Sequence, residues 1–249
     1  MSSLKKYIQI ACLLATLPVR GAGGPEKPHG SNAPTLTAHQ DVLILGFMGG
    51  RDRRDDERVG VGRFATKLRA MGLPCVRVAT MENTKRALAL AMVLRAFDRN
   101  GDGQIDSHER EATHLILYGQ SFGGAAVVKF ARQLKAAGVP VMLTVQVDAV
   151  GLDDQVIPSN VAAAASLFQR NGIFIHGPRQ IRAADPQATE IVGNFQFDYR
   201  DSPISISDLA WHKTLLRESH TRMDRDPAVW SKVEDLILSA LARNGRCAP

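Results

Sequence analysis

The chain has 249 residues, which is long enough for one domain with a substantial core. Hydrophobic residues make up 45% and charged residues 22%, ordinary proportions for a globular protein that exclude a fully disordered chain. The formal net charge falls from +6 to +3 without the three basic residues Lys5, Lys6 and Arg20 near the N-terminus. This small excess gives little reason to expect a nucleic-acid partner.

The N-terminal segment predicts export. Two lysines precede an uncharged, mostly apolar run over 7–18, and small residues follow over 21–24. This order is typical of a secretory signal peptide, although a buried N-terminal helix is the alternative. The run is shorter than the ~20 residues that cross a bilayer, so we expect no stable membrane insertion after cleavage. We predict a signal peptide over 1–23, a flexible leader over 24–40, and a periplasmic or extracellular mature protein.

Two cysteines, Cys75 and Cys247, remain after the predicted cleavage. In an oxidising compartment they could form a disulfide that ties the C-terminal tail to the body of the domain. Two free thiols are the alternative, because the sequence says nothing about the distance between them.

Strand-like apolar runs alternate with helical stretches over the predicted domain, 41–249. This alternation predicts an α/β fold with three layers, α/β/α, around a mostly parallel sheet. The predicted strands are 42–45, 75–79, 115–118, 141–147, 173–175 and 191–197. The predicted helices are 61–71, 87–97, 124–136, a helix capped by Ser159 that carries Val161, Ala165 and Phe168, and a last helix opened by Asp226-Pro227.

A Gly-x-Ser-x-Gly motif, Gly119-Gln120-Ser121-Phe122-Gly123, joins an apolar strand to a helix. A serine on such a sharp turn projects its hydroxyl above the sheet, and the helix N-terminus directs amide groups at a developing oxyanion. The alternative is an ordinary strand-to-helix turn with Ser121 as the helix cap.

In this context the chain resembles the α/β-hydrolase family, particularly its lipase, esterase and thioesterase branch, over most of 41–249. The resemblance implies a serine hydrolase that cleaves a carboxylic ester or thioester through an acyl-enzyme on Ser121. Its substrate would be a small-molecule or lipid-like ester, and no organic cofactor is expected. No long lid insertion separates the motifs, which mildly favours soluble or short-chain esters.

The family's chain order, Ser then acid then His, implies Asp148 and His220 as the other triad members. His220 lies in a polar stretch before the last helix, where we expect a loop, and Asp148 ends the strand 141–147. The fallback base is His212, and the competing acids are Asp153, Asp154, Asp198 and Asp201.

An oxyanion hole needs two amide donors. The resemblance implies the amide of Phe122 and a second donor in the loop 46–50, with Phe47 first and Met48 next. The charged run over 51–58 is expected to be a solvated surface that borders the site.

The twelve residues 98–109 fit the EF-hand signature. Only about six residues separate Glu109 from the strand at Leu115, so any second helix is very short. We therefore predict one structural calcium ion and not a switch; an acidic turn without metal is the alternative. The predicted ligands are Asp98, Asn100, Asp102, the Gln104 carbonyl, Asp106 and Glu109.

A function from another class also fits these patterns. The chain could be a non-catalytic exported protein that resembles α/β-hydrolases and is stabilised by calcium. The presence of plausible Ser, Asp and His residues argues against that alternative.

Overall fold

The computed structural model describes residues 42–172, 175–201, 204–208 and 217–243. The predicted signal peptide and leader lie outside these residues. Contacts gather the described residues into one compact unit. No helix in the described part of the chain combines the length and apolar character needed to cross a membrane.

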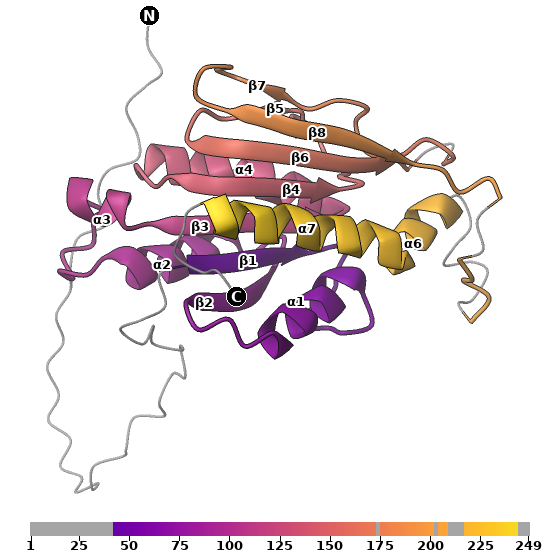
Figure 1. The fold of residues 1–249 in the computed structure, drawn as a ribbon, viewed down its shortest axis with the longest axis horizontal. Helices are drawn as coiled ribbons and strands as arrows, with labels where there is room; N and C mark the ends of the chain where they lie inside the picture. The colour runs from indigo at the N-terminus through magenta and orange to yellow at the C-terminus, as the bar shows by residue number, and fades with distance from the viewer. Residues whose placement is uncertain (1–41, 173–174, 202–203, 209–216, 244–249) are drawn as a thin grey trace, which may run out of the picture. The chain divides into compact units, whose positions relative to one another are not determined.

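The centre of the fold is a six-stranded sheet in which all neighbouring strands are parallel (Figure 1). The strand order is β2-β1-β3-β4-β6-β8. Parallel pairs need crossover connections, which accounts for the helices between most strands. The strands are β1 (Val42–Met48), β2 (Val76–Glu82), β3 (His114–Gln120), β4 (Val141–Val147), β6 (Val161–Gln169) and β8 (Glu190–Phe197), with a short separate pair, β5 (Val156–Ile157) and β7 (Arg182–Ala183).

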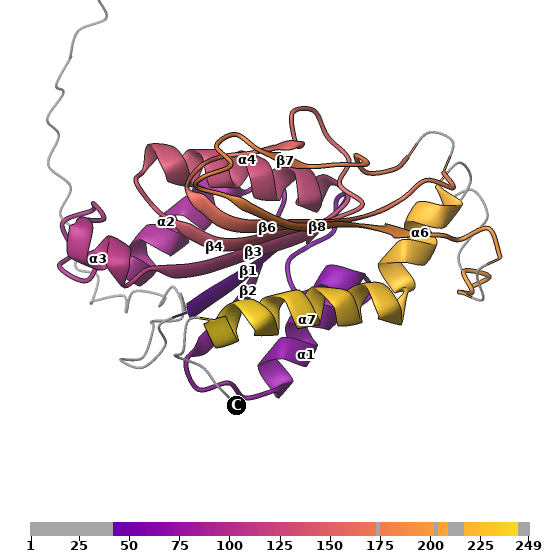
Figure 2. The same ribbon diagram turned by 45° about the horizontal axis from the view of Figure 1, so that its top comes forward.

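Helices cover both faces of the sheet, which confirms the predicted three-layer α/β/α class (Figure 2). One face carries α1 (Gly60–Ala70), α6 (Glu218–Arg225) and α7 (Pro227–Arg243), and the other carries α2 (Arg86–Phe97) and α4 (Phe122–Ala136). The short helix α3 (Ser107–Glu111) begins within the loop 98–109 and leads into β3, and its five residues agree with the expectation that any second helix is very short.

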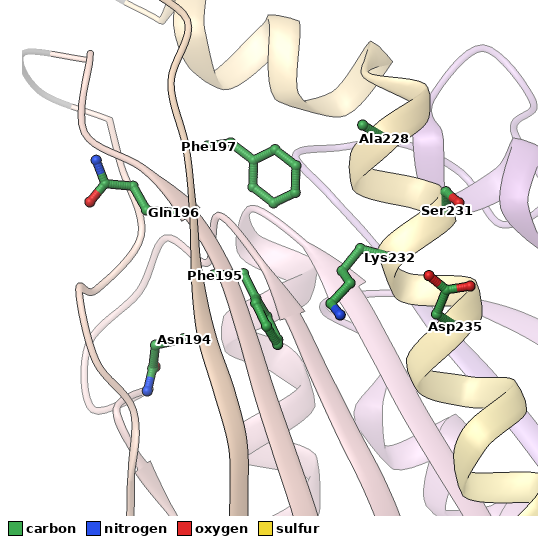
Figure 3. A pocket seen from close by; sticks show the side chains of 8 residues that line it. All are labelled: Asn194, Phe195, Gln196, Phe197, Ala228, Ser231, Lys232 and Asp235. Atoms are coloured by element: carbon green, nitrogen blue, oxygen red, sulfur yellow. The ribbon is translucent and has the colours of Figure 1, made fainter.

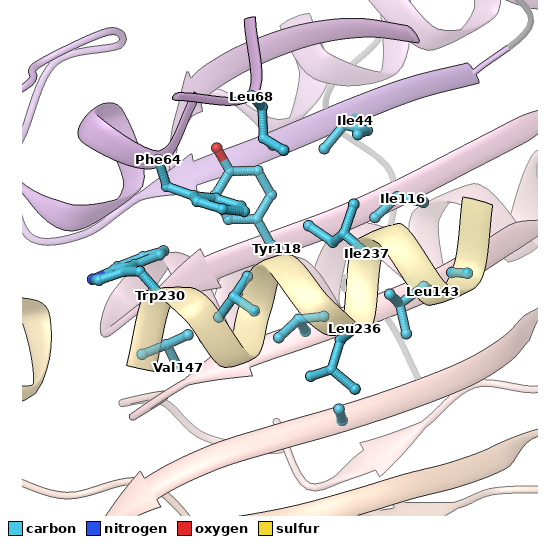
Figure 4. Close-up of a cluster of buried hydrophobic side chains, with 14 of the residues drawn as sticks. Ile44, Phe64, Leu68, Ile116, Tyr118, Leu143, Val147, Trp230, Leu236 and Ile237 are labelled. Carbon is cyan, nitrogen blue, oxygen red and sulfur yellow. The ribbon is translucent and has the colours of Figure 1, made fainter. Parts of the chain in front are cut away.

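Alternate side chains of the strands feed two separate cores. In β1, Ile44 packs on the side of α1 and α7, whereas Leu43 and Leu45 pack on the side of α2 and α4. Figure 4 shows Trp230 and Ile237 of α7 among the side chains that rise from the sheet. Full burial of such a side chain stabilises the fold by about 1.5–3 kcal/mol, so these two cores hold the strand ends in a fixed arrangement.

The helix predicted after Ser159 is wrong, because residues 161–169 form strand β6. β6 lies between β4 and β8, and eight of its nine residues are buried. A strand covered on both faces shows a continuous apolar run instead of alternation, and its alanines fit a helix equally well. Residues 173–174 of another predicted strand lie outside the described residues, and Ile175 belongs to no strand.

Candidate functional site

Ser121 lies on the tight turn between β3 and α4, with φ 59° and ψ −127°. A positive φ in a non-glycine residue costs about 1–3 kcal/mol, so the surrounding structure must impose it. The flanking glycines permit the close approach of strand and helix. A Cβ on Gly119 would lie 2.5 Å from the Gly123 oxygen, and one on Gly123 would lie 2.0 Å from the Phe47 oxygen. The turn therefore has the geometry that the motif predicts.

Backbone hydrogen bonds join the Ser121 turn to the end of the neighbouring strand. The Ser121 amide donates to the Val147 oxygen at 3.0 Å, and the Val150 amide donates to the Ser121 oxygen at 3.0 Å. Asp148 lies between these two bonded residues of the β4 end. The acid predicted from the sequence is thus held beside the turn that carries the serine.

Asp148 is fully buried and adopts φ 40°. Its Oδ1 accepts the Gly177 amide at 2.6 Å, and its Oδ2 accepts the Gln169 amide side chain at 2.9 Å and His220 Nδ1 at 2.7 Å. Buried carboxylates persist where several donors compensate the lost hydration. Gln169 and Gly177 were missed in the sequence, because no motif marks a residue whose only role is to orient an acid.

His220 reaches this acid from a position 72 residues further along the chain. It lies in helix α6, so the expectation of a loop at this position is wrong. The ring is buried, with 8% of the residue exposed. Its Nε2 lies 3.1 Å from Nε2 of Gln120. Within the described residues, no hydrogen bond joins Ser121 Oγ to His220.

The competing residues are less well placed. His176 Nδ1 lies 2.8 Å from Arg170 Nη1, and Asp198 pairs with Arg200. His212 lies outside the described residues. Among the acids that the structure describes, Asp148 is the one hydrogen-bonded to His220.

The two predicted oxyanion donors lie close to the Ser121 turn but have different surroundings. Phe122 is the first residue of α4, and the residue is 53% exposed. Phe47 lies within β1, which continues to Met48, so the loop begins at Gly49 and not at residue 46 as predicted. The Phe47 ring is buried against Phe130, with centroids 5.2 Å apart. The assignment of these amides as oxyanion donors stays a prediction.

The loop after β1 carries carboxylates with shifted pKa values. Burial, and then the charge of Asp224, raise the pKa of Asp52. Burial also raises the pKa of Asp224, which accepts the Gly60 amide at 2.9 Å. Hydrogen bonds from Arg58 lower the pKa of Asp56 to about 2. Most residues of the run 51–58 are exposed, as expected of a solvated surface, whereas Asp52 and Asp56 are partly buried.

Side chains of the loop 98–109 accept hydrogen bonds from backbone amides of the same loop. The two side-chain oxygens of Asp98 accept the amides of Gly101 at 2.7 Å and Gly103 at 2.8 Å, and both glycines have positive φ. Glu109 is buried and caps the first turn of α3. No group of three His, Cys, Asp or Glu side chains suited to a metal ion is found in the part of the chain that the structure describes. Calcium binding stays a prediction.

Calcium should raise the melting temperature of the mature protein and EDTA should lower it, because an ion bound only by the folded state stabilises that state. Differential scanning calorimetry measures both effects. The variant Asp102→Asn tests the predicted ligands. Its exposed residue 102 loses its charge, so the difference in melting temperature between calcium and EDTA should shrink. Identical melting curves with calcium and EDTA would rule the site out.

A pocket of about 570 Å³ lies between β8 and α7 (Figure 3). Phe195 and Phe197 face it from the strand, and Lys232 extends from the helix with Nζ 4.5 Å from the Phe195 ring centroid. None of the residues that line this pocket belongs to the predicted triad.

No protein-family model matches the chain, and no curated protein does. Two similar solved structures are of the NocB thioesterase domain. In one, a covalent complex with a fluorophosphonate nocardicin G analog, identity is 14%, TM-score 0.36, and coverage 80% of this chain and 94% of that chain. In the other, the domain from the nocardicin cluster, identity is 16%, TM-score 0.37, and coverage 81% and 94%. An iodinated complex of acetyl xylan esterase has 11% identity, TM-score 0.31, and coverage of 78% and 98%. TM-scores this low do not establish a shared function.

Proposed function

We propose that the protein is a serine hydrolase that cleaves a carboxylic ester or thioester through an acyl-enzyme on Ser121. The observation that carries this proposal is the buried hydrogen bond between Asp148 and His220, 2.7 Å long, beside the strained turn of Ser121. A buried acid–imidazole pair beside a serine on a strand-to-helix turn is the arrangement that activates a hydroxyl as a nucleophile.

In the proposed reaction, Ser121 Oγ attacks the substrate carbonyl while its proton moves to His220 Nε2. The negative charge on the carbonyl oxygen is stabilised by backbone amides, for which Phe122 and Phe47 are the candidates. The tetrahedral intermediate expels the alcohol or thiol, which takes the proton from His220. Water then attacks the acyl-enzyme in the same way and regenerates the serine hydroxyl.

A fluorophosphonate probe tests the proposal directly. The serine oxygen displaces fluoride from phosphorus, so the folded mature protein should gain a stable mass adduct on Ser121. The Ser121→Ala variant should gain none. A wild-type protein that is folded, as judged by circular dichroism, yet stays unlabelled would favour the non-catalytic alternative.

Two exposed apolar side chains favour a substrate with an apolar group. Phe122 follows the serine directly, and Leu152, 81% exposed, lies two residues after Val150, which is bonded to the Ser121 turn. We propose that they contact the acyl or alcohol part of the ester. Comparing short-chain and long-chain acyl esters separates an esterase from a lipase-like enzyme, and Leu152→Ala should weaken any preference for longer chains.

We also infer that the protein is exported to the periplasm or the cell exterior. Cys75 is disulfide-bonded, and stable disulfides are typical of oxidising compartments. Cys12 and Cys247 both lie outside the described residues, so the predicted pairing with Cys247 stays a prediction. Fusion of the first 40 residues to a reporter that is active only after export tests the localisation.

Replacing Cys75 by serine should lower the melting temperature by about 5–15 °C. Loss of a native disulfide costs about 2–4 kcal/mol, and each kcal/mol shifts the transition of a domain of this size by about 2–4 °C. A thermal scan with and without reductant measures the effect. Reductant should lower the melting temperature of the wild type and leave Cys75→Ser unchanged; equal curves for all samples would contradict the prediction.

A further inference from the structure

Gln120 contacts the nitrogen of His220 that the proposed reaction uses as its base. Gln120 is the last residue of β3, lies directly before Ser121 and is 7% exposed. Its side-chain nitrogen is 3.1 Å from His220 Nε2. A Cβ on Gly49 would lie 2.9 Å from the Gln120 side-chain oxygen, so the amide is held against the backbone of the loop after β1.

The protons of the imidazole decide the direction of this hydrogen bond. A neutral histidine has one N–H and one acceptor nitrogen, and an ionised carboxylate only accepts. Asp148 lies 2.7 Å from Nδ1, so in the neutral ring Nδ1 carries the proton and Nε2 offers its lone pair. The Gln120 amide therefore donates to Nε2. That single lone pair is also the acceptor that Ser121 needs in order to lose its proton.

We propose that Gln120 is a positioning residue that occupies the base nitrogen of His220 in the resting enzyme, so that Ser121 becomes nucleophilic only when this hydrogen bond is released. The inference rests on the proposed function and adds a form of regulation to the same site. It accounts for the observation that Nε2 is bonded to Gln120, while no hydrogen bond from Ser121 to His220 is present among the described residues.

The expected effect is set by the strength of one hydrogen bond. An uncharged hydrogen bond contributes modestly to the balance between two states, which corresponds to a rate change of about 2- to 10-fold. Gln120→Met keeps a side chain of similar length but removes the donor. The second-order rate of fluorophosphonate labelling at Ser121 should therefore rise by about 2- to 10-fold.

The control is Gln196→Met, which makes the same exchange at an exposed position of β8, in the pocket that contains no predicted triad residue. This variant should label at the wild-type rate. If Gln120→Met does not fold, Gln120→Leu tests the same loss of the donor. A labelling rate that is unchanged or slower in the folded Gln120 variants would overturn the inference.

Nitrogen NMR of His220 supplies a readout that does not depend on reaction at Ser121. In the Gln120 variants the Nε2 signal should move downfield, as expected for an acceptor that has lost its donor, while the Nδ1 proton bonded to Asp148 keeps its position. An unmoved Nε2 signal would overturn the contact itself. If the signal moves but no variant or wild type is labelled, the proposed function fails, and Gln120 is then only a structural partner of His220.

Discussion

Ser121→Ala is expected to lower kcat/KM for acyl esters by at least about 10⁴-fold, because removal of one member of a catalytic triad removes the covalent route. The hydroxyl takes part in no hydrogen bond within the described residues, so the melting temperature should change little. Initial rates on a chromogenic short-chain ester measure the loss of activity, and a thermal scan verifies the fold.

The matched control for this serine is Ser231→Ala. Ser231 lies on α7 and lines the pocket beside β8, which contains no residue of the predicted triad. Its replacement should leave the rate on a short-chain ester within a factor of about two, since surface substitutions have small effects on the folded state. Residual activity in Ser121→Ala within tenfold of the wild type would contradict the assignment of Ser121 as the nucleophile.

Replacing Asp148 should separate orientation of the histidine from stability. Asp148→Asn keeps the shape but offers one acceptor oxygen and an NH₂ group, so His220 loses the partner that fixes its tautomer. We expect kcat to fall by about 10³- to 10⁴-fold. Asp148→Ala also leaves the Gly177 amide and His220 Nδ1 without their acceptor, and leaves the Gln169 side-chain nitrogen with only the Ile175 oxygen. The free energy of unfolding should then fall by about 3–5 kcal/mol.

Urea unfolding and steady-state kinetics of the two Asp148 variants measure these effects side by side. Asp153→Asn is the control, because Asp153 is an exposed residue of the same loop and has no contact with His220 among the described residues. An Asp148→Asn variant with wild-type kcat would show that the acid acts elsewhere. Equal stability of the Ala variant and the wild type would contradict the view that this buried carboxylate organises its neighbours.

The Ser121 turn could be predicted from the local sequence, whereas the contacts of Asp148 and His220 depend on the tertiary structure. The turn at Ser121 was predictable, because glycine is required where Gly123 approaches Phe47 to a distance that admits no Cβ. The pairing of His220 with Asp148 was predictable only through the resemblance to a family. Gln120 lay within the predicted motif, but nothing in its spacing indicates that its side chain bends toward a histidine 100 residues away.

The wrong prediction of a helix at 161–169, like the failure to predict the contacts of Gln169 and Gly177, arises because tertiary packing decides the outcome. Its alanines are compatible with a helix, and burial between β4 and β8 selected a strand. Propensity is a weak preference compared with the free energy gained by completing a sheet. The segment around His220 shows the opposite error. Its polar sequence predicts a loop, but it forms helix α6, in which Met223 is buried in the core.

The amino-acid sequence by itself indicated the α/β class, because apolar runs alternate with helical stretches along the domain, and the tight turn of Ser121, because its glycines lie within two residues of it. The candidate acid at the end of β4 followed from the sequence together with the resemblance to a family. Only the tertiary structure decided that β6 is a strand, that His220 lies on a helix, and that Gln120, Gln169 and Gly177 surround the acid–histidine pair. These contacts join two different strands, a loop and a helix, and their geometry follows from how the two cores pack against the sheet.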